Sequence, residues 1–467
     1  MRNGVNNLTK INSWMNDITA CFAFLKYCLG YKGNMSRMVA GMDWQELYSF
    51  ASKQALLGLC FEGIERLGEE YPEELKRNPI GRELLMTWMG KAQQIRRQNM
   101  KVNAVASKLF SMLREDGMRC CILKGQGNAL MYPNPYSRTP GDIDVWIDAS
   151  RERIMEYAQK KFELGDDIRL QHLETSLDGV PVELHFFPCS MNNPIYHARL
   201  QKWFRRNADL QCSNVVSLPD GAGDIAIPTT AFNVVYQLTH LYHHFFDEGI
   251  GMRQIIDYLL VVCDFYKVYQ NSSKITPSLF TLKEGSTSHP DPLTLREEGE
   301  TAPSRRSEPL RSKVGGPSKV SPGCAGWDRL EMEGDSSATS CSSTAVASSS
   351  SAVTLEVMQR ELKYLGLWKF AGAVMYVLRE VLGLSEEKMI APMDEKRGKL
   401  LLAEILNGGN FGQHFTKYGH FTQQGMAKKY FLKIWRNMHF VRYYPAEALS
   451  EPIFRTWHFF WRMKNKK

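Results

Sequence analysis

Cysteine is infrequent in this sequence, and the ten cysteines among its 467 residues follow no recognisable spacing. They are scattered singly except for the neighbours Cys120 and Cys121, and no Cys-x-x-Cys pair is present. A disulfide framework like that of small secreted domains is therefore not expected. This use of cysteine is typical of a reducing compartment, so we predict a cytoplasmic protein.

Long apolar runs of the kind that span a membrane are also lacking. A short apolar stretch from Ile18 to Leu29 follows Asp17, is interrupted by Lys26, and is not followed by a small-residue cleavage pattern. We expect it to form a core helix, neither a signal peptide nor a transmembrane segment. The hydrophobic content of 43% is ordinary for a globular protein, and the chain is long enough for two or three domains.

Positive charge is concentrated at the C-terminal end. Residues 417–467 carry eleven Lys or Arg and two Asp or Glu, which gives this basic tail a net charge of +9. The whole sequence has a net charge of +8, so the residues before the tail are together close to neutral. Aromatic residues are interleaved with these cations, a pattern that could bind single-stranded RNA, an acidic membrane surface or another polyanion. Packing is the simpler explanation, because Trp457, Phe460 and Trp461 recur at helical spacing, and we expect these rings to dock onto the protein body.

Two carboxylates stand one residue apart in an apolar run, in the sequence Gly141-Asp142-Ile143-Asp144-Val145. Side chains alternate across a strand, so Asp142 and Asp144 are expected on one face, with Ile143 and Val145 on the core side. Magnesium prefers a few carboxylate oxygens together with water and substrate phosphates. The pattern predicts a divalent metal site, and its alternative is an exposed strand edge.

The segments on either side favour the metal site. A predicted strand from Arg119 to Leu123 leads into the turn Lys124-Gly125-Gln126-Gly127. Downstream, residues 171–187 read as a β-hairpin about Asp178-Gly179, with Glu183 and His185 on one face of its second strand. Glu183 is then a candidate third carboxylate, able to bind a metal near an acceptor and help to deprotonate its hydroxyl.

Together these residues resemble a known group. Leu123-Lys124-Gly125, Arg138, the Asp142/Asp144 pair and Val182-Glu183-Leu184-His185 are similar to a bacterial nucleotidyltransferase family within the polymerase-β-type superfamily. The resemblance extends to Asp43 through Leu47, to His240 through His244, and to Gly251 through Gln254 with Asp257. It covers most of the chain outside about 271–354. The glycine of that superfamily is usually followed by serine, whereas Gln126 follows here, and the interval to the acidic pair is longer.

The resemblance implies transfer of a nucleoside monophosphate with release of pyrophosphate. Asp142 and Asp144 would bind two Mg²⁺ ions, with Mn²⁺ as an alternative, and Glu183 would complete the site next to the acceptor. The backbone amides of Gly125 and Gly127 would approach the phosphates. Lys124 or Arg138 would offset charge on the departing pyrophosphate. Each of these two also has a structural explanation, Lys124 as a solvated charge and Arg138 as a loop brace to Asp142 or Asp148.

The helix predicted from Phe232 to Phe246 carries three histidines. His240 and His244 share one face, which is a possible transition-metal geometry, but no further ligand at standard spacing follows, so a buried or nucleotide-contacting role is favoured over zinc. The resemblance places both in the nucleotide cleft, with Gln126 and His185 as further nucleotide contacts. Arg253 could reach a triphosphate or pair with Asp257 at i, i+4.

The periodicity predicts an α+β fold, a small mixed sheet flanked by helical regions. We expect an N-terminal helical module at 1–118, with a capped helix after Asp43 and a long helix from about Arg82 to Arg114. The nucleotidyltransferase core follows at 119–228, with a helix over 151–161 capped by Ser150. Helices packing on the core occupy 229–270, and a C-terminal helical region occupies 355–467.

The segment 271–354 differs in kind, because it holds 19 serines in 84 residues and few aromatics. Such a composition cannot bury enough apolar surface to offset the entropy of ordering, so we predict a disordered insertion. The glycine-rich stretch Ala403 to Gly412 follows a helical pattern, which indicates a helix C-terminus and not a phosphate loop.

The leading hypothesis is a magnesium-dependent nucleotidyltransferase that uses a nucleoside triphosphate and a hydroxyl acceptor on a small molecule, protein or RNA. The alternative is a catalytically silent nucleotide- or RNA-binding protein, such as a toxin–antitoxin component. The acceptor and the base preference cannot be derived from these residues, because one set of carboxylates serves many acceptors.

Overall fold

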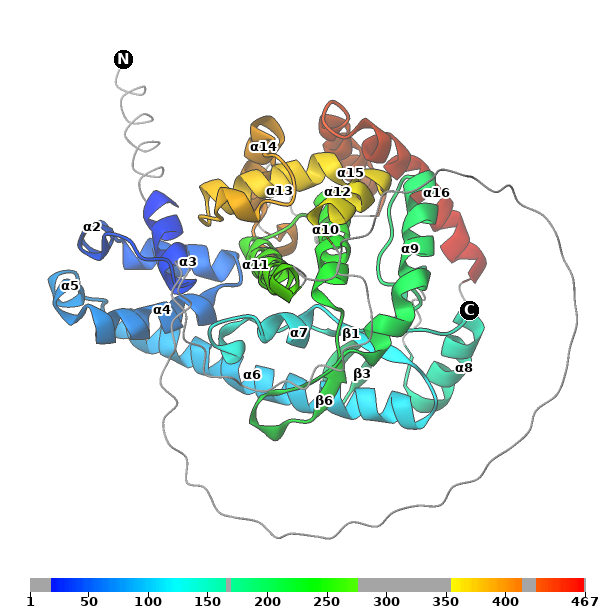
Figure 1. Ribbon diagram of the computed structural model, residues 1–467, viewed down its shortest axis with the longest axis horizontal. Coiled ribbons are helices and arrows are strands. Elements are labelled where there is room, and N and C mark those ends of the chain that lie inside the picture. The colour runs from blue at the N-terminus through cyan, green and yellow to red at the C-terminus, as the bar shows by residue number, and fades with distance from the viewer. Residues whose placement is uncertain (1–17, 165–168, 276–353, 414–425, 466–467) are drawn as a thin grey trace, which may run out of the picture. The chain divides into compact units, whose positions relative to one another are not determined.

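The computed structural model describes residues 18–164, 169–275, 354–413 and 426–465, and within them helices surround two small sheets (Figure 1). This arrangement confirms the predicted α+β class. No described helix is both long enough and apolar enough to cross a membrane. The insertion predicted at 271–354 falls almost entirely on residues 276–353, which lie outside the described residues.

The N-terminal part is helical, as its apolar period predicts. A helix runs through residues 18–28 and buries Phe24 and Leu25, so the expected core helix is confirmed. The helices that follow are α2 (Met35–Ala40), α3 (Trp44–Lys53), α4 (Leu57–Glu70), α5 (Pro72–Arg77) and α6 (Arg82–Glu115).

Two local signals fix the starts of these helices. The Asp43 carboxylate accepts hydrogen bonds from the backbone amides of Gln45 and Glu46, and so satisfies two amides that the first turn of α3 leaves without helical partners. Pro72 occupies the first turn of α5, where a residue without an amide hydrogen is tolerated. The cap at Asp43 follows the sequence prediction.

The main sheet has the strand order β1-β2-β4-β3. Strand β1 (Cys120–Leu123) runs antiparallel to β2 (Ile143–Ile147), β2 runs parallel to β4 (Val180–His185), and β4 runs antiparallel to β3 (His172–Leu177). Between them lie α7 (Gly125–Ala129), the 3₁₀ turn η1 (Pro135–Ser137) and α8 (Arg151–Lys161), which the Ser150 hydroxyl caps as predicted. The β3–β4 turn has positive φ at both Asp178 and Gly179, as a primed hairpin turn requires.

One face of this sheet is apolar throughout. Ile143, Val145 and Ile147 of β2 are buried beside Val182 and Leu184 of β4. The long helix α6 contributes its C-terminal half to the same core and packs against β1 and β6. Alternation along each strand therefore sends the intervening residues, Asp144 and Glu183 among them, to the opposite face.

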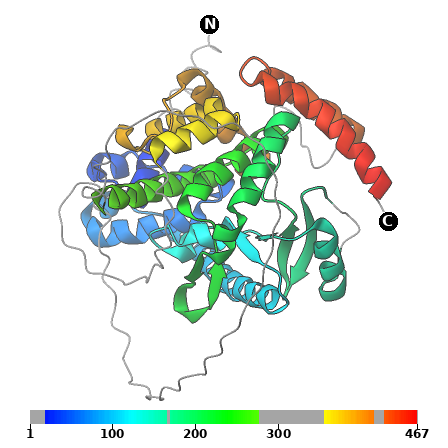
Figure 2. The ribbon, with the colours of Figure 1, turned by 45° about the vertical axis from the view of Figure 1, so that its right-hand side comes forward.

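Helices cover that opposite face. Trp146 of β2 stacks on Phe232 at the start of α10 (Thr230–Asp247). Phe204 of α9 (Pro194–Ser213) also packs on the Trp146 ring. A two-stranded sheet, β5 (Val215–Ser217) and β6 (Asp224–Ala226), connects α9 to α10 around the turn η2 (Pro219–Gly221). Helices α10 and α11 (Met252–Ile275) lie side by side in both views (Figures 1 and 2), where the Tyr258 hydroxyl donates to the Val234 carbonyl.

The C-terminal helices pack on the same helical core. They are α12 (Leu355–Tyr364), α13 (Trp368–Glu380), α14 (Glu395–Gly408), α15 (Met426–Phe440) and α16 (Pro445–Asn465), with the turns η3 (Glu386–Lys388) and η4 (Asn410–Gly412). Gly409 ends α14 with a positive φ, so the glycines from 408 to 412 form a helix C-terminus, as predicted. The Gln54 amide of the N-terminal part donates to the Ile405 carbonyl and accepts from the Met252 amide.

The packing expected for the aromatic residues at the C-terminal end is wrong for Trp457 and Phe460. Trp457 is 50% exposed and Phe460 is 62% exposed, while Trp461 is partly buried and has the Arg151 guanidinium over its ring. The helical spacing was correct, but the rings of Trp457 and Phe460 face away from the core. Phe440 and Tyr444 are buried in that core instead. Contact of this tail with a polyanion stays a prediction.

Candidate active site

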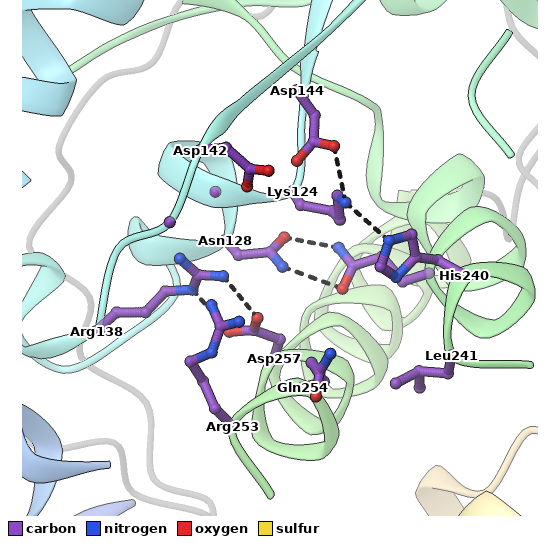
Figure 3. Close-up of a pocket in the computed structure, with 13 residues that line it drawn as sticks. Lys124, Asn128, Arg138, Asp142, Asp144, His240, Leu241, Arg253, Gln254 and Asp257 are labelled. Atoms are coloured by element: carbon purple, nitrogen blue, oxygen red, sulfur yellow. Dashed lines mark hydrogen bonds and ion pairs between the residues drawn. The ribbon is translucent and has the colours of Figure 1, made fainter. Parts of the chain in front are cut away.

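A pocket opens where the β1–α7 turn and the start of β2 face helices α10 and α11 (Figure 3). Its lining combines carboxylates, cations and amides, and the residues are Lys124, Gly125, Asn128, Arg138, Gly141, Asp142, Asp144, Gln237, His240, Leu241, Arg253, Gln254 and Asp257. Seven of the residues proposed from the sequence therefore line it: Lys124, Gly125, Arg138, Asp142, Asp144, His240 and Arg253.

Strand register brings two of the predicted acids together. Asp144 of β2 lies opposite Glu183 of β4 in the parallel ladder, and alternation puts both on the face away from the sheet core. The next row of this face joins Trp146 to His185, and His185 to His172 on β3. The third predicted acid, Asp142, precedes β2, and Figure 3 shows its carboxylate beside that of Asp144.

The proximity of the acids changes their pKa values. Repulsion from Asp144 is the largest cause that raises the pKa of Asp142 to about 6, and burial adds to it. Burial also favours the neutral form of Asp144, but Lys124 and His185 outweigh it and hold the Asp144 pKa well below its usual range. The ionised carboxylates of this site therefore repel each other, and a bound cation would reduce that repulsion.

Lys124 adopts an unusual backbone conformation. It follows β1 with φ of 49° and ψ of −128°, a region that residues other than glycine rarely occupy. This bend directs its side chain into the pocket, where Nζ lies 2.9 Å from Asp144 Oδ1 and 2.8 Å from His240 Nε2. The interpretation of Lys124 as a solvated charge is thus wrong, since its side chain is only 20% exposed.

His185 connects two acids. Its Nε2 lies 3.0 Å from Asp144 Oδ1 and 3.1 Å from Glu183 Oε2. Burial disfavours the charged imidazole, but these two hydrogen bonds outweigh that effect and raise the His185 pKa to about 9. Glu183 responds in the opposite direction: burial raises its pKa, yet the net shift is downward because of His185. In the absence of a metal, His185 and Lys124 provide the positive charge beside the acids.

Arg138 is bound to a carboxylate that neither sequence interpretation named. Its Nε and Nη2 donate to the two oxygens of Asp257 at 2.9 and 2.8 Å, and the Tyr132 hydroxyl donates to the same carboxylate at 2.8 Å. The proposed brace to Asp142 or Asp148 is therefore wrong in its partner, although Arg138 does line the pocket. Arg253 donates to the Thr139 carbonyl and, with Arg138, helps to hold the Asp257 pKa down against burial.

Two buried amides of this pocket were not among the residues predicted from the sequence. Asn128 of α7 and Gln237 of α10 exchange hydrogen bonds, 3.1 Å in one direction and 2.6 Å in the other, and both are buried. A helical periodicity test could have found Gln237, because it lies three residues before His240 and so shares its face. The pair connects the turn after β1 to the helix that carries His240.

The remaining predicted nucleotide contacts lie outside the pocket lining. Gln126 is buried and its amide donates to Asn103 of α6, and Gly127 faces Ile227. His244 lies one turn beyond His240, with 3.0 Å between their Nε2 atoms. Glu183 and His185 lie behind Asp144 on the sheet, next to the pocket but not among the residues that line it.

A comparison with protein families gives a match over this part of the chain. Residues 40–269 match the model of a protein family described as uncharacterised nucleotidyltransferase. The matched segment includes both sheets and every residue that lines the pocket. No curated protein and no solved structure matches the chain.

Proposed function

Because the chain belongs, through residues 40–269, to the uncharacterised nucleotidyltransferase family, we propose that it transfers a nucleoside monophosphate from a nucleoside triphosphate to a hydroxyl acceptor. The reaction forms a bond between the acceptor oxygen and the α-phosphorus and breaks the bond from that phosphorus to the pyrophosphate. The observation that carries the proposal is the register of β2 with β4, which sets Glu183 beside Asp144 next to a pocket that contains Asp142.

The acids fit a divalent cation. Carboxylate oxygens are the ligands that Mg²⁺ prefers, and the raised pKa of Asp142 reports a negative charge that lacks compensation. Asp142, Asp144 and Glu183 would hold Mg²⁺ or Mn²⁺. When bound, such ions offset charge on the attacking and leaving oxygens of a phosphoryl displacement.

The protein's own side chains supply the other requirements. Lys124, Arg138 and Arg253 line the pocket and are cations that can bind the phosphates of a triphosphate. Glu183, whose pKa is shifted downward, is ionised and can accept the proton of an acceptor hydroxyl. Asp257 holds Arg138 by two hydrogen bonds, so this guanidinium is oriented before any substrate arrives.

One observation favours the second candidate, a nucleotide-binding protein without turnover. Gln126 occupies the position at which the superfamily usually carries a serine, and its side chain is bonded to Asn103 of α6 instead of facing the pocket. No hydroxyl is then supplied to a phosphate at this point. The two candidates differ only in whether pyrophosphate leaves.

The test incubates the full chain with each α-labelled nucleoside triphosphate, MgCl₂ or MnCl₂, and fractionated small molecules, RNA and protein from a cell lysate as acceptors. We expect metal-dependent pyrophosphate release and labelling of one acceptor fraction, both lost in Asp142→Asn and Asp144→Asn. Asp148→Asn is the matched control, because Asp148 directly follows β2 but pairs with Arg119 at the surface. Nucleotide binding that is equal in all variants, without pyrophosphate release, would establish the silent binder instead.

A further inference from the structure

Three further potential metal ligands lie together on β3 and β4. His172 is the cross-strand partner of His185, and Glu183 precedes His185 by two residues on the same face. One ligand atom from each of these side chains lies within 4.8 Å of the other two. The two imidazole rings are 5.0 Å apart, centre to centre.

The separations match those around a small dication. Glu183 Oε2 lies 3.1 Å from His185 Nε2 and 3.3 Å from His172 Nδ1. Tetrahedral ligands that are each about 2.1 Å from a metal lie roughly 3.4 Å from one another. Two of the three separations therefore already fit, and the third, between the ligand nitrogens of the two histidines, is no more than 4.8 Å.

His172 provides an independent indication. It is only 9% exposed, yet its Nδ1, 3.3 Å from Glu183 Oε2, is not aligned for a hydrogen bond, and the Glu174 carboxylate lies 3.8 Å from its Nε2. Buried polar atoms in proteins almost always have a hydrogen-bond partner. The nitrogens of this ring therefore lack a well-aligned partner, and the ring lies next to Glu183 and His185. Glu183 keeps 21% of its side chain exposed, which leaves a route by which an ion can enter.

We infer that His172, Glu183 and His185 form a binding site for a divalent first-row transition-metal ion. Two imidazole nitrogens and one carboxylate suit such an ion, whereas Mg²⁺ selects oxygen ligands. Three protein ligands leave coordination positions open, as catalytic sites do and closed structural sites do not.

Glu183 belongs both to this site and to the site proposed beside the acceptor, so the ion bound here would lie next to the acceptor. The role of this ion in the reaction rests on the proposed function. The binding of the ion does not. Metal binding is measured without nucleotide, so the inference and the proposed function can fail separately.

The experiment titrates the metal-stripped full chain with Co²⁺ and records the visible absorption that nitrogen ligation produces. We expect one ion per chain, displaced by Zn²⁺ but not by a large excess of Mg²⁺. His172→Phe, which keeps an aromatic ring beside His185, should weaken Co²⁺ binding at least about tenfold. His197→Phe is the matched control, because His197 lies outside the cluster against Phe187, and it should bind Co²⁺ like the parent.

Equal Co²⁺ affinity in His172→Phe and the parent, or displacement by Mg²⁺, overturns the inference whether or not the protein releases pyrophosphate. A second measurement needs no variant: with excess Mg²⁺ present to fill the carboxylate site, substoichiometric Co²⁺ should broaden the imidazole NMR resonances of His172 and His185 before those of His197 and His439. Uniform broadening of all histidine resonances would also overturn the site.

Discussion

Arg138 holds both carboxylate oxygens of Asp257, at 2.9 and 2.8 Å, across 119 residues of sequence. Each side chain is almost completely buried, 4% exposed for the arginine and 6% for the aspartate. The contact joins the loop before β2 to helix α11, so it positions one wall of the pocket that contains Asp142. A buried ion pair of this kind is costly to disrupt on one side only.

Removal of one partner should therefore be strongly destabilising. We expect Asp257→Ala to lower the free energy of unfolding by about 3–5 kcal/mol, because the Arg138 charge would remain buried without its partner. Urea denaturation checks this value. Glu73→Ala, which breaks an exposed pair with Lys76, should cost at most about 1 kcal/mol. Similar losses in the two variants would contradict the prediction.

Two glycines in helices should respond oppositely to alanine. A Cβ at Gly58 of α4 would overlap the Ser137 carbonyl, immediately before Arg138, so Gly58→Ala should destabilise the protein by about 1–3 kcal/mol and weaken nucleotide binding. A Cβ at Gly90 of α6 meets nothing within 4 Å, and Gly90→Ala should stabilise by up to about 1 kcal/mol. Thermal unfolding of both variants measures the difference in sign.

A divalent cation should compensate in part for loss of the positive charge of Lys124. Lys124→Met removes the charge beside Asp144, and we expect it to lower the free energy of unfolding by about 2–3 kcal/mol. Millimolar Mg²⁺ should then stabilise Lys124→Met more than the parent, because the variant leaves more negative charge for the ion to neutralise. Melting curves with and without the metal test this. Lys108→Met, at an exposed pair with Asp178, is the control, and an identical response to Mg²⁺ in all three proteins would refute the idea.

The amide pair of Asn128 and Gln237 should show strong coupling. Each single change to leucine leaves the other buried amide without its partner and should cost about 1–3 kcal/mol. The double variant should lose clearly less than the sum of the two, because both polar groups are then gone. A double-mutant cycle measured by denaturation gives the coupling, and strict additivity would show that the pair is not an energetic unit.

Glu447 should make stability depend on pH. It is 2% exposed, and burial raises its pKa from 4.5 to about 7, although the backbone amides of Asn192 and Asn193 donate to it. Between these two pH values the folded protein keeps a proton that the unfolded chain has released. The free energy of unfolding contributed by this group therefore falls as the pH rises from about 4.5 to about 7, by at most about 3 kcal/mol. Glu447→Gln should lose this slope, and parallel stability–pH curves for the two proteins would contradict the assignment.

Much of the local structure could be predicted from the sequence. The strand alternation from Ile143 to Ile147, the Asp178-Gly179 turn and the caps at Asp43 and Ser150 are set by nearby residues, so they appear where the pattern places them. Asp142, which was expected on the same strand, lies just before it. The same alternation placed Glu183 and His185 on one strand face. Each of these features depends on contacts within a few residues.

Tertiary structure alone decided which faces meet. Alternation fixes the side of a strand but not its neighbour, and only the parallel register of β2 with β4 places Asp144 beside Glu183 and His185 beside Trp146. The partner of Arg138 lies 119 residues away, and the exposed rings of Trp457 and Phe460 sit on a helix whose spacing alone predicted burial. The sequence by itself determined which chemical groups each strand and helix presents. Long-range packing decided which of them share a site, because burial against distant elements, and not local backbone preference, sets register and orientation.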